Sequence, residues 1–136
     1  MSKLLEQLKR HEGHRSQLYT CSAGKLTIGY GHNIEELGVS GAVSELMLAE
    51  DVAVAYDAAM TVSYWDELNP ARQDVLVNMV FNMGFPRFSG FKKMHAALSI
   101  DDYDAASKEM LNSKWAIQVG DRARELSAQM ANGEYV

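Results

Sequence analysis

The chain has little of what several classes of protein require. Cys21 is its only cysteine in 136 residues, so no disulfide can form within the chain and nothing demands an oxidising compartment. It contains no apolar run of about 18 residues, the length that spans a bilayer. Residues 1–10 carry charges throughout and lack the apolar centre of a signal peptide. We therefore expect synthesis in the cytoplasm and no stable insertion into a membrane.

Excess positive charge is also missing. The net charge of −5 argues against nucleic acid as a partner, because proteins that bind it usually carry a basic face. No group of His, Cys and acidic residues has the spacing of metal ligands, so we expect no metal and no cofactor. The sequence shows no repeat and no heptad run. Its length fits one domain that can bury a hydrophobic core without the help of disulfides or metals.

The N-terminal half predicts a helix, a hairpin and a longer helix. Residues 3–11 place apolar side chains on one stripe (Leu4, Leu5 and Leu8), with Ser2 as the N-cap. Residues 17–21 and 25–30 read as two short strands around a turn at 22–24. Residues 33–41 read as a solvated loop. Ser40 then caps a helix to about residue 60, with Val43, Met47, Val54 and Ala58 on one side.

The C-terminal half predicts several helices. Asn69 and Pro70 form an N-cap and N1 pair, and the helix that they begin carries a regular apolar stripe and stops at Gly84. A turn is predicted at 85–90, followed by helices at about 90–98, 102–112 and 121–131, with Asp101 and Gly120 at two of the starts. The predicted class is α+β, mainly helical, with a small antiparallel sheet near the N-terminus.

The stretch from Glu12 to His32 combines an acid, a thiol and a hydroxyl within a run bounded by glycines. Glu12 stands where the first helix should end, facing the negative end of the helix dipole, a placement that costs about 0.3–1 kcal/mol. Residues that break a local rule in this way are candidates for function. Eight residues separate Glu12 from Cys21, five separate Cys21 from Thr27, and Ile-Gly-Tyr-Gly-His follows.

This order and spacing resemble the active site of the phage-type lysozymes, the muramidase endolysins of bacteriophages and prophages. Their pattern is Glu, eight residues, Asp or Cys, five residues, Thr, and then Ile-Gly-X-Gly-His. Residues 77–84 (Val-Asn-Met-Val-Phe-Asn-Met-Gly) and 113–115 (Ser-Lys-Trp) look like the central-helix and C-terminal signatures of the family. After His32 the chain looks shorter than larger members.

The resemblance implies a lysozyme-like fold: a small lobe at about 13–42, a linking helix at about 43–60, and a helical lobe at about 61–136 that includes residues 1–12. It implies a glycoside hydrolase that cleaves the β-1,4 bond between N-acetylmuramic acid and N-acetylglucosamine in peptidoglycan and so lyses the host cell. We expect a monomer that reaches the cell wall through a separately encoded pore protein.

Three residues are predicted to be catalytic. Glu12 is the general acid, because glycoside cleavage needs a carboxylic acid that protonates the leaving oxygen. Thr27 holds the attacking water through its hydroxyl. Cys21 departs from the more usual Asp, and a neutral thiol is a poor base. It can act on water as a thiolate, attack the sugar, or stay passive while Glu12 and Thr27 supply most of the rate.

The resemblance also assigns supporting roles. His32 is expected to be a structural histidine paired with Asp51, and Arg122 to lie near the acid and tune it. Trp115 and Tyr19 are expected to pack rather than stack on sugars. The positions that match substrate contacts in the family are Gly31, Asn33, Phe81, Met94 and Glu109.

Three alternatives stay open from the sequence. A lytic transglycosylase of the same fold needs one acid/base and no water-activating carboxylate, which suits Cys21. A non-catalytic module could keep the groove and bind the cell wall without cleaving it. A peptidase could use Cys21 and His32, although the glycine-framed context does not resemble a nucleophile carried on a helix.

Overall fold

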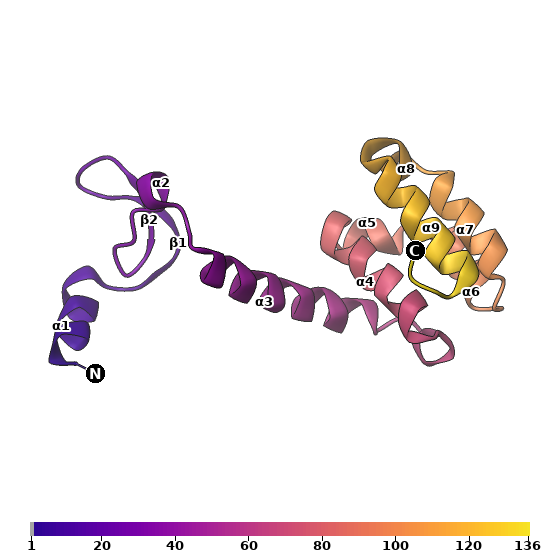
Figure 1. Cartoon of the computed structure of the whole chain (residues 1–136), viewed down its shortest axis with the longest axis horizontal. Helices are drawn as coiled ribbons and strands as arrows, with labels where there is room; N and C mark the ends of the chain where they lie inside the picture. The colour runs from indigo at the N-terminus through magenta and orange to yellow at the C-terminus, as the bar shows by residue number, and fades with distance from the viewer. Residues whose placement is uncertain (1) are drawn as a thin grey trace. The chain divides into compact units, whose positions relative to one another are not determined.

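The computed structural model describes residues 2–136, and its internal contacts form two units (Figure 1). The boundary between the units falls after Met47, within helix α3 (Gly41–Ala59). The first unit holds two short helices, the start of α3 and the only sheet among the described residues, and the second is helical. The predicted α+β class, mainly helical with a small N-terminal sheet, is confirmed.

The first unit begins with helix α1 (Lys3–Glu12), whose N-cap is Ser2 as predicted: the Ser2 hydroxyl accepts from the N–H of Leu5. Gly13 ends the helix with φ of 68°, a value that favours glycine, and its N–H bonds to the carbonyl of Lys9. The polypeptide therefore turns directly after Glu12. Within its own unit α1 buries none of its residues.

Strands β1 (Arg15–Thr20) and β2 (Leu26–Gly29) form the predicted antiparallel hairpin. Tyr19 pairs with Thr27, and an irregularity in register lies between Arg15 and Tyr19. The expected loop at 33–41 is partly wrong, because Asn33 caps a short helix α2 (Ile34–Leu37) by accepting from the N–H of Glu36. An Asn followed by two glutamates is a helix start that the sequence reading passed over.

Helix α3 begins after Ser40, whose hydroxyl accepts from the N–H of Val43 as expected of a cap. The predicted apolar side is not the side that is buried. Ala55 and Ala59 are buried, Ala58 is half-buried, and Val54 is 71% exposed. Apolar residues lie all around this helix, so periodicity alone does not select a face.

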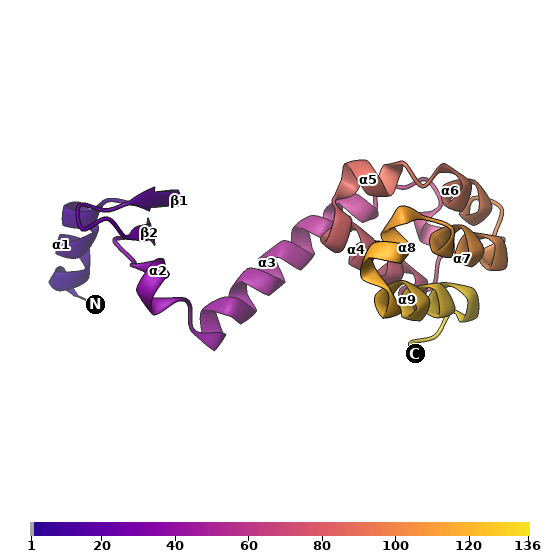
Figure 2. The same cartoon turned by 90° about the horizontal axis from the view of Figure 1, so that it is seen from above.

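The second unit contains a 3-10 turn (Trp65–Glu67) and α4 (Pro70–Met83), α5 (Phe85–Ser89), α6 (Lys92–Leu98), α7 (Tyr103–Leu111), α8 (Lys114–Val119) and α9 (Asp121–Asn132) (Figure 2). Asn69 and Gly84 bound α4 as predicted. Three expectations were wrong. Residues 85–90 are mostly helix α5, α8 was missed, and the cap of α7 is Asp102 rather than Asp101.

The core of this unit surrounds α4, whose predicted stripe is Val75, Leu76, Met79, Val80 and Met83; the first four are buried and Met83 is partly buried against them. Trp115 is 2% exposed, as expected of a packing residue, and its indole N–H donates to Asn82 Oδ1 at 2.7 Å. Arg72 fixes the end of α9, because its guanidinium donates to the carbonyls of Met130 and Ala131 and stacks on the ring of Tyr103.

Candidate active site

Glu12 is the last residue of α1, and its exposed carboxyl group lies directly against the backbone of Gly31. Two contacts hold the end of the helix beside the loop that contains Gly31. The ammonium of Lys9 lies 5.5 Å from the centre of the Tyr30 ring, and the rings of His14 and Tyr30 are 4.9 Å apart. The acid is thus seated on a defined backbone surface.

Cys21 is half-buried at the end of the hairpin, where its backbone N–H donates to the carbonyl of Lys25 at 2.9 Å. The pKa of its thiol is lowered by the backbone N–H of Lys25 first, then by the Thr27 hydroxyl and the backbone N–H of Ala23. These donors favour the thiolate because each stabilises negative charge on sulfur. At a given pH, a larger fraction of Cys21 is therefore present as thiolate than of an ordinary cysteine.

Thr27 is 2% exposed, and its hydroxyl donates to the carbonyl of Lys25 at 2.9 Å. A hydroxyl has one proton, so this proton serves either that carbonyl or the Cys21 thiolate, while the oxygen keeps lone pairs that can accept from a water molecule. The hairpin thus brings Cys21 and Thr27 together, and their catalytic roles stay a prediction.

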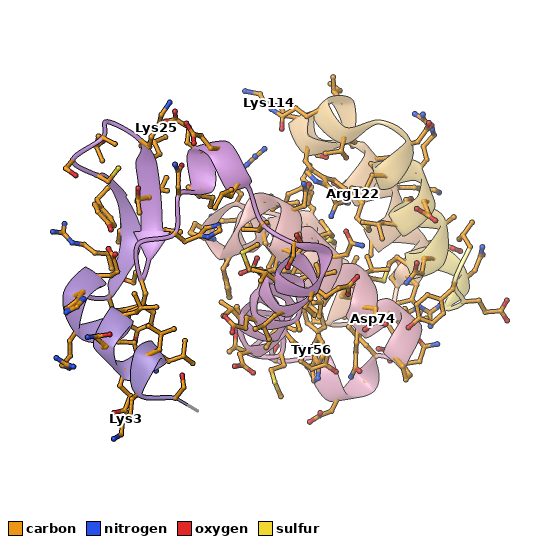
Figure 3. The ribbon with its side chains drawn as sticks, turned by 60° about the vertical axis from the view of Figure 1, so that its left-hand side comes forward. Lys3, Lys25, Tyr56, Asp74, Lys114 and Arg122 are labelled. Atoms are coloured by element: carbon orange, nitrogen blue, oxygen red, sulfur yellow. The ribbon has the colours of Figure 1, made fainter. Side chains whose placement is uncertain are left out.

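Lys25 is the residue that sequence reasoning missed. Its carbonyl accepts hydrogen bonds from the backbone N–H of Cys21 and the hydroxyl of Thr27. Its ammonium forms ion pairs with Glu36 at 3.0 Å and Glu35 at 3.6 Å, beside α2 (Figure 3). The signal available was a lysine directly before a strand with two acids ten residues later. Such surface charges are common, so the signal is weak.

His32 and Asn33 follow the glycine-framed segment. His32 Nε2 donates to the carbonyl of Gly38 at 2.7 Å, which leaves Nδ1 as its other hydrogen-bonding atom. Asn33 caps α2 and also reaches Glu36 with its amide. The pairing of His32 with Asp51 stays a prediction.

In the second unit, Arg122 and Phe81 line one pocket of about 430 Å³, which also contains Tyr56 and Asp74 (Figure 3). The guanidinium of Arg122 donates through Nε and Nη2 to Asn78 Oδ1 at 3.0 and 2.7 Å, so its orientation is fixed and one terminal nitrogen stays available. Phe81 is 43% exposed, so it is not part of the buried core and its ring is accessible to a ligand.

Met94 and Glu109 line a different pocket, of about 420 Å³, together with Phe91 and Asn112. Met94 is fully buried, so it forms the floor of this pocket, whereas Glu109 is half-buried at its edge. Among residues 2–136 no group of three His, Cys, Asp or Glu side chains is arranged to hold a metal ion. No helix within that range is long and apolar enough to cross a membrane.

Comparison with known proteins points to one family. Residues 9–131 match the family model described as phage lysozyme. The chain is 33% identical over 118 residues to the endolysin of Acyrthosiphon pisum secondary endosymbiont phage 1, a match that covers 84% of this chain and 77% of that protein. It is 30% identical over 115 residues to the endolysin of Salmonella phage P22, covering 79% and 77% of the two chains.

A cellular relative extends the likeness. The chain is 28% identical to the probable T4-type lysozyme 2 of Dictyostelium discoideum over an alignment of 163 positions, which covers 98% of this chain and 96% of that protein. The alignment is longer than the 136 residues of this chain, so the relative carries insertions, in keeping with the shorter chain that the sequence predicted. On its sequence and its relatives, this chain belongs to the phage lysozyme family.

Proposed function

We propose that this lysozyme hydrolyses the β-1,4 bond between N-acetylmuramic acid and N-acetylglucosamine in bacterial peptidoglycan, with Glu12 as the general acid. The observation that carries the proposal is the local arrangement of the first unit. Glu12 ends α1, and the hairpin that follows places Cys21 and Thr27 on adjoining backbone. Glu12 gives its proton to the glycosidic oxygen as the bond from that oxygen to the anomeric carbon breaks.

Cys21 takes the place of the usual carboxylate. In our proposal its thiolate removes a proton from a water molecule, whose oxygen then bonds to the anomeric carbon, and Thr27 accepts a hydrogen bond from the same water. The donors around the thiol support this role because they stabilise the charged form at the expense of the neutral one. The other two roles, attack on the sugar and a passive thiol, are outcomes of the test described below.

Residues of both units are proposed to complete the site. Gly31, Asn33, Phe81 and Glu109 would contact the glycan strand, whereas Met94, which is fully buried, would support the pocket that Glu109 borders. Arg122 would place its available terminal nitrogen near Glu12, and His32 would use Nδ1 to bond Asp51. The expected lobes, with the linking helix between them and residues 1–12 joined to the helical lobe, belong to the same proposal.

The likeness to endolysins supports a proposal for the route to the substrate. We propose that the enzyme acts as a monomer and lyses the host after release through a separate pore protein. Lysis that needs no such pore in cells expressing only this chain would contradict that route.

The test of the acid is Glu12→Gln, with Glu6→Gln as the matched control, because Glu6 is an exposed acid on the same helix. Positioned acid catalysis is worth about 10²–10⁴-fold, so release of reducing ends from purified peptidoglycan should fall by that factor in Glu12→Gln alone. Full activity of Glu12→Gln would contradict the proposal and favour a peptidase. Binding to the cell wall with no products from the wild type would favour the non-catalytic module.

A further inference from the structure

The carboxyl group of Glu12 occupies the space that a side chain at position 31 would need. A Cβ added to Gly31 would lie 2.7 Å from Glu12 Oε2, 2.9 Å from Cδ and 3.1 Å from Cγ. Ordinary contacts of a Cβ begin at 3.4 Å, so the whole distal half of Glu12 packs on the bare backbone of this glycine.

The position of Gly31 is fixed by its own loop. Ile28 and His32 exchange two backbone hydrogen bonds, of 2.9 and 3.0 Å, which close the segment between them. Gly29 and Gly31 both have φ of 68° within this closed loop. The loop therefore presents Gly31 at a fixed place rather than as part of a flexible connection.

The position of Glu12 is fixed from the other side. Gly13 ends the helix directly after Glu12, and Arg15 then pairs with Gly29 at the start of the hairpin. The contacts of Tyr30 with Lys9 and His14 hold the same two segments together. Several contacts therefore hold Glu12 and Gly31 opposite each other.

We infer that Gly31 is a positioning residue for the acid: the absence of a Cβ at this position gives the Glu12 carboxyl group its place. The catalytic part of this inference rests on the proposed function of Glu12. The placement of the Glu12 carboxyl group against Gly31 rests on the structure alone. It differs from the predicted contact of Gly31 with substrate, which concerns binding rather than the geometry of the acid.

A methyl group at position 31 would displace the acid without unfolding the protein. The atoms that it meets belong to the far end of a flexible side chain, which can rotate into solvent. A shift of about 1 Å in a catalytic group can cost about 10²-fold in rate. The expected signature of Gly31→Ala is therefore a fall in kcat of about that size, well beyond any rise in KM from the proposed contact of Gly31 with the glycan.

Gly29→Ala is the matched control. It has the same left-handed φ of 68°, which strains an alanine at either position, but a Cβ there meets nothing within 4 Å. Circular dichroism melting should show similar losses of Tm in the two variants. Kinetics on soluble glycan strands should show the loss of kcat in Gly31→Ala alone.

Two outcomes would overturn the inference. An equal fall of kcat in both variants would assign the effect to strain in the loop, and a rise in KM with normal kcat in Gly31→Ala would assign Gly31 to substrate binding.

The placement of the Glu12 carboxyl group against Gly31 has its own test, which does not depend on activity. The ¹³Cδ resonance of Glu12 should shift in Gly31→Ala and stay in place in Gly29→Ala, and an unchanged resonance in both would refute it. If Glu12→Gln retained activity while the Glu12 resonance shifted in Gly31→Ala, the proposed function would be refuted. The placement of Glu12 against Gly31 would still hold.

Discussion

Replacing the thiol at position 21 with an alcohol tests how this enzyme activates water. Cys21→Ser keeps the size and the half-buried position of the side chain, but a serine hydroxyl does not ionise in the range where proteins are stable. The N–H of Lys25, the Thr27 hydroxyl and the N–H of Ala23 would then surround a neutral group. The variant removes a possible base while the turn that holds it is preserved.

The expected magnitude follows from the role. General base catalysis contributes about 10²–10⁴-fold, so kcat/KM of Cys21→Ser should fall by that factor, or about 3–5 kcal/mol in the activation barrier. The free energy of unfolding should change by less than about 1 kcal/mol, because the side chain is only half-buried and the substitution adds no volume.

The assay is the initial rate of reducing-end formation from purified peptidoglycan, with a melting curve for each variant. Cys21→Asp is the control, since it restores the carboxylate that most relatives of this pattern are expected to carry, and it should keep substantial activity. Activity of Cys21→Ser near that of the wild type would show that the thiol is passive and would refute the base role.

Three further predictions concern titration and stability. Because the pKa of the Cys21 thiol is lowered, its thiolate forms at lower pH than that of an unperturbed cysteine, so the pH midpoint of alkylation by iodoacetamide should lie below that of a short cysteine peptide measured alongside; an equal or higher midpoint would contradict it. Trp115→Phe should lose the hydrogen bond to Asn82 and some core packing, about 2 kcal/mol in chemical denaturation, and an unchanged midpoint would show that the bond is unimportant. Arg72→Met should lose two bonds to the end of α9 and its stacking on Tyr103, about 2–3 kcal/mol, whereas Arg124→Met, an exposed arginine of α9, should lose under about 1 kcal/mol.

The elements that the sequence predicted well are those with local chemical signals. Ser2, Ser40 and Asn69 were recognised as caps, and each accepts a backbone N–H in the structure. Helix α4 combines a cap, a regular apolar stripe and a stop at Gly84, so its boundaries were predictable. The hairpin was predictable because short β-branched and aromatic runs flank a turn.

The errors have physical causes. Residues 85–90 contain Pro and Gly, which favour a turn, but Pro86 sits in the first turn of α5, where a missing N–H costs nothing. Helix α8 is six residues long and owes its cap to Ser113, whose hydroxyl accepts from the N–H of Ala116. So short a helix has no apolar periodicity that the sequence could reveal. The family signature at 113–115 also covers its start.

The candidate site was predictable as a pattern but not as geometry. Glu12, Cys21 and Thr27, the three residues that the spacing selects, lie in the same unit, and their catalytic roles stay a prediction. The sequence did not indicate that the carbonyl of Lys25 accepts hydrogen bonds from both Cys21 and Thr27, because a backbone contact does not depend on the residue type. It also did not indicate that the Glu12 carboxyl group packs on Gly31, which depends on the closure of the 28–32 loop.

The most direct test of the central claim is mass spectrometry of the sugar products released from purified peptidoglycan. Hydrolysis with Glu12 as acid and an activated water predicts reducing N-acetylmuramic acid ends, and digestion in H₂¹⁸O should place one ¹⁸O atom at each new end. Anhydro-muramic acid ends without ¹⁸O would contradict the account, because they would mean that Glu12 acts alone in a lytic transglycosylase.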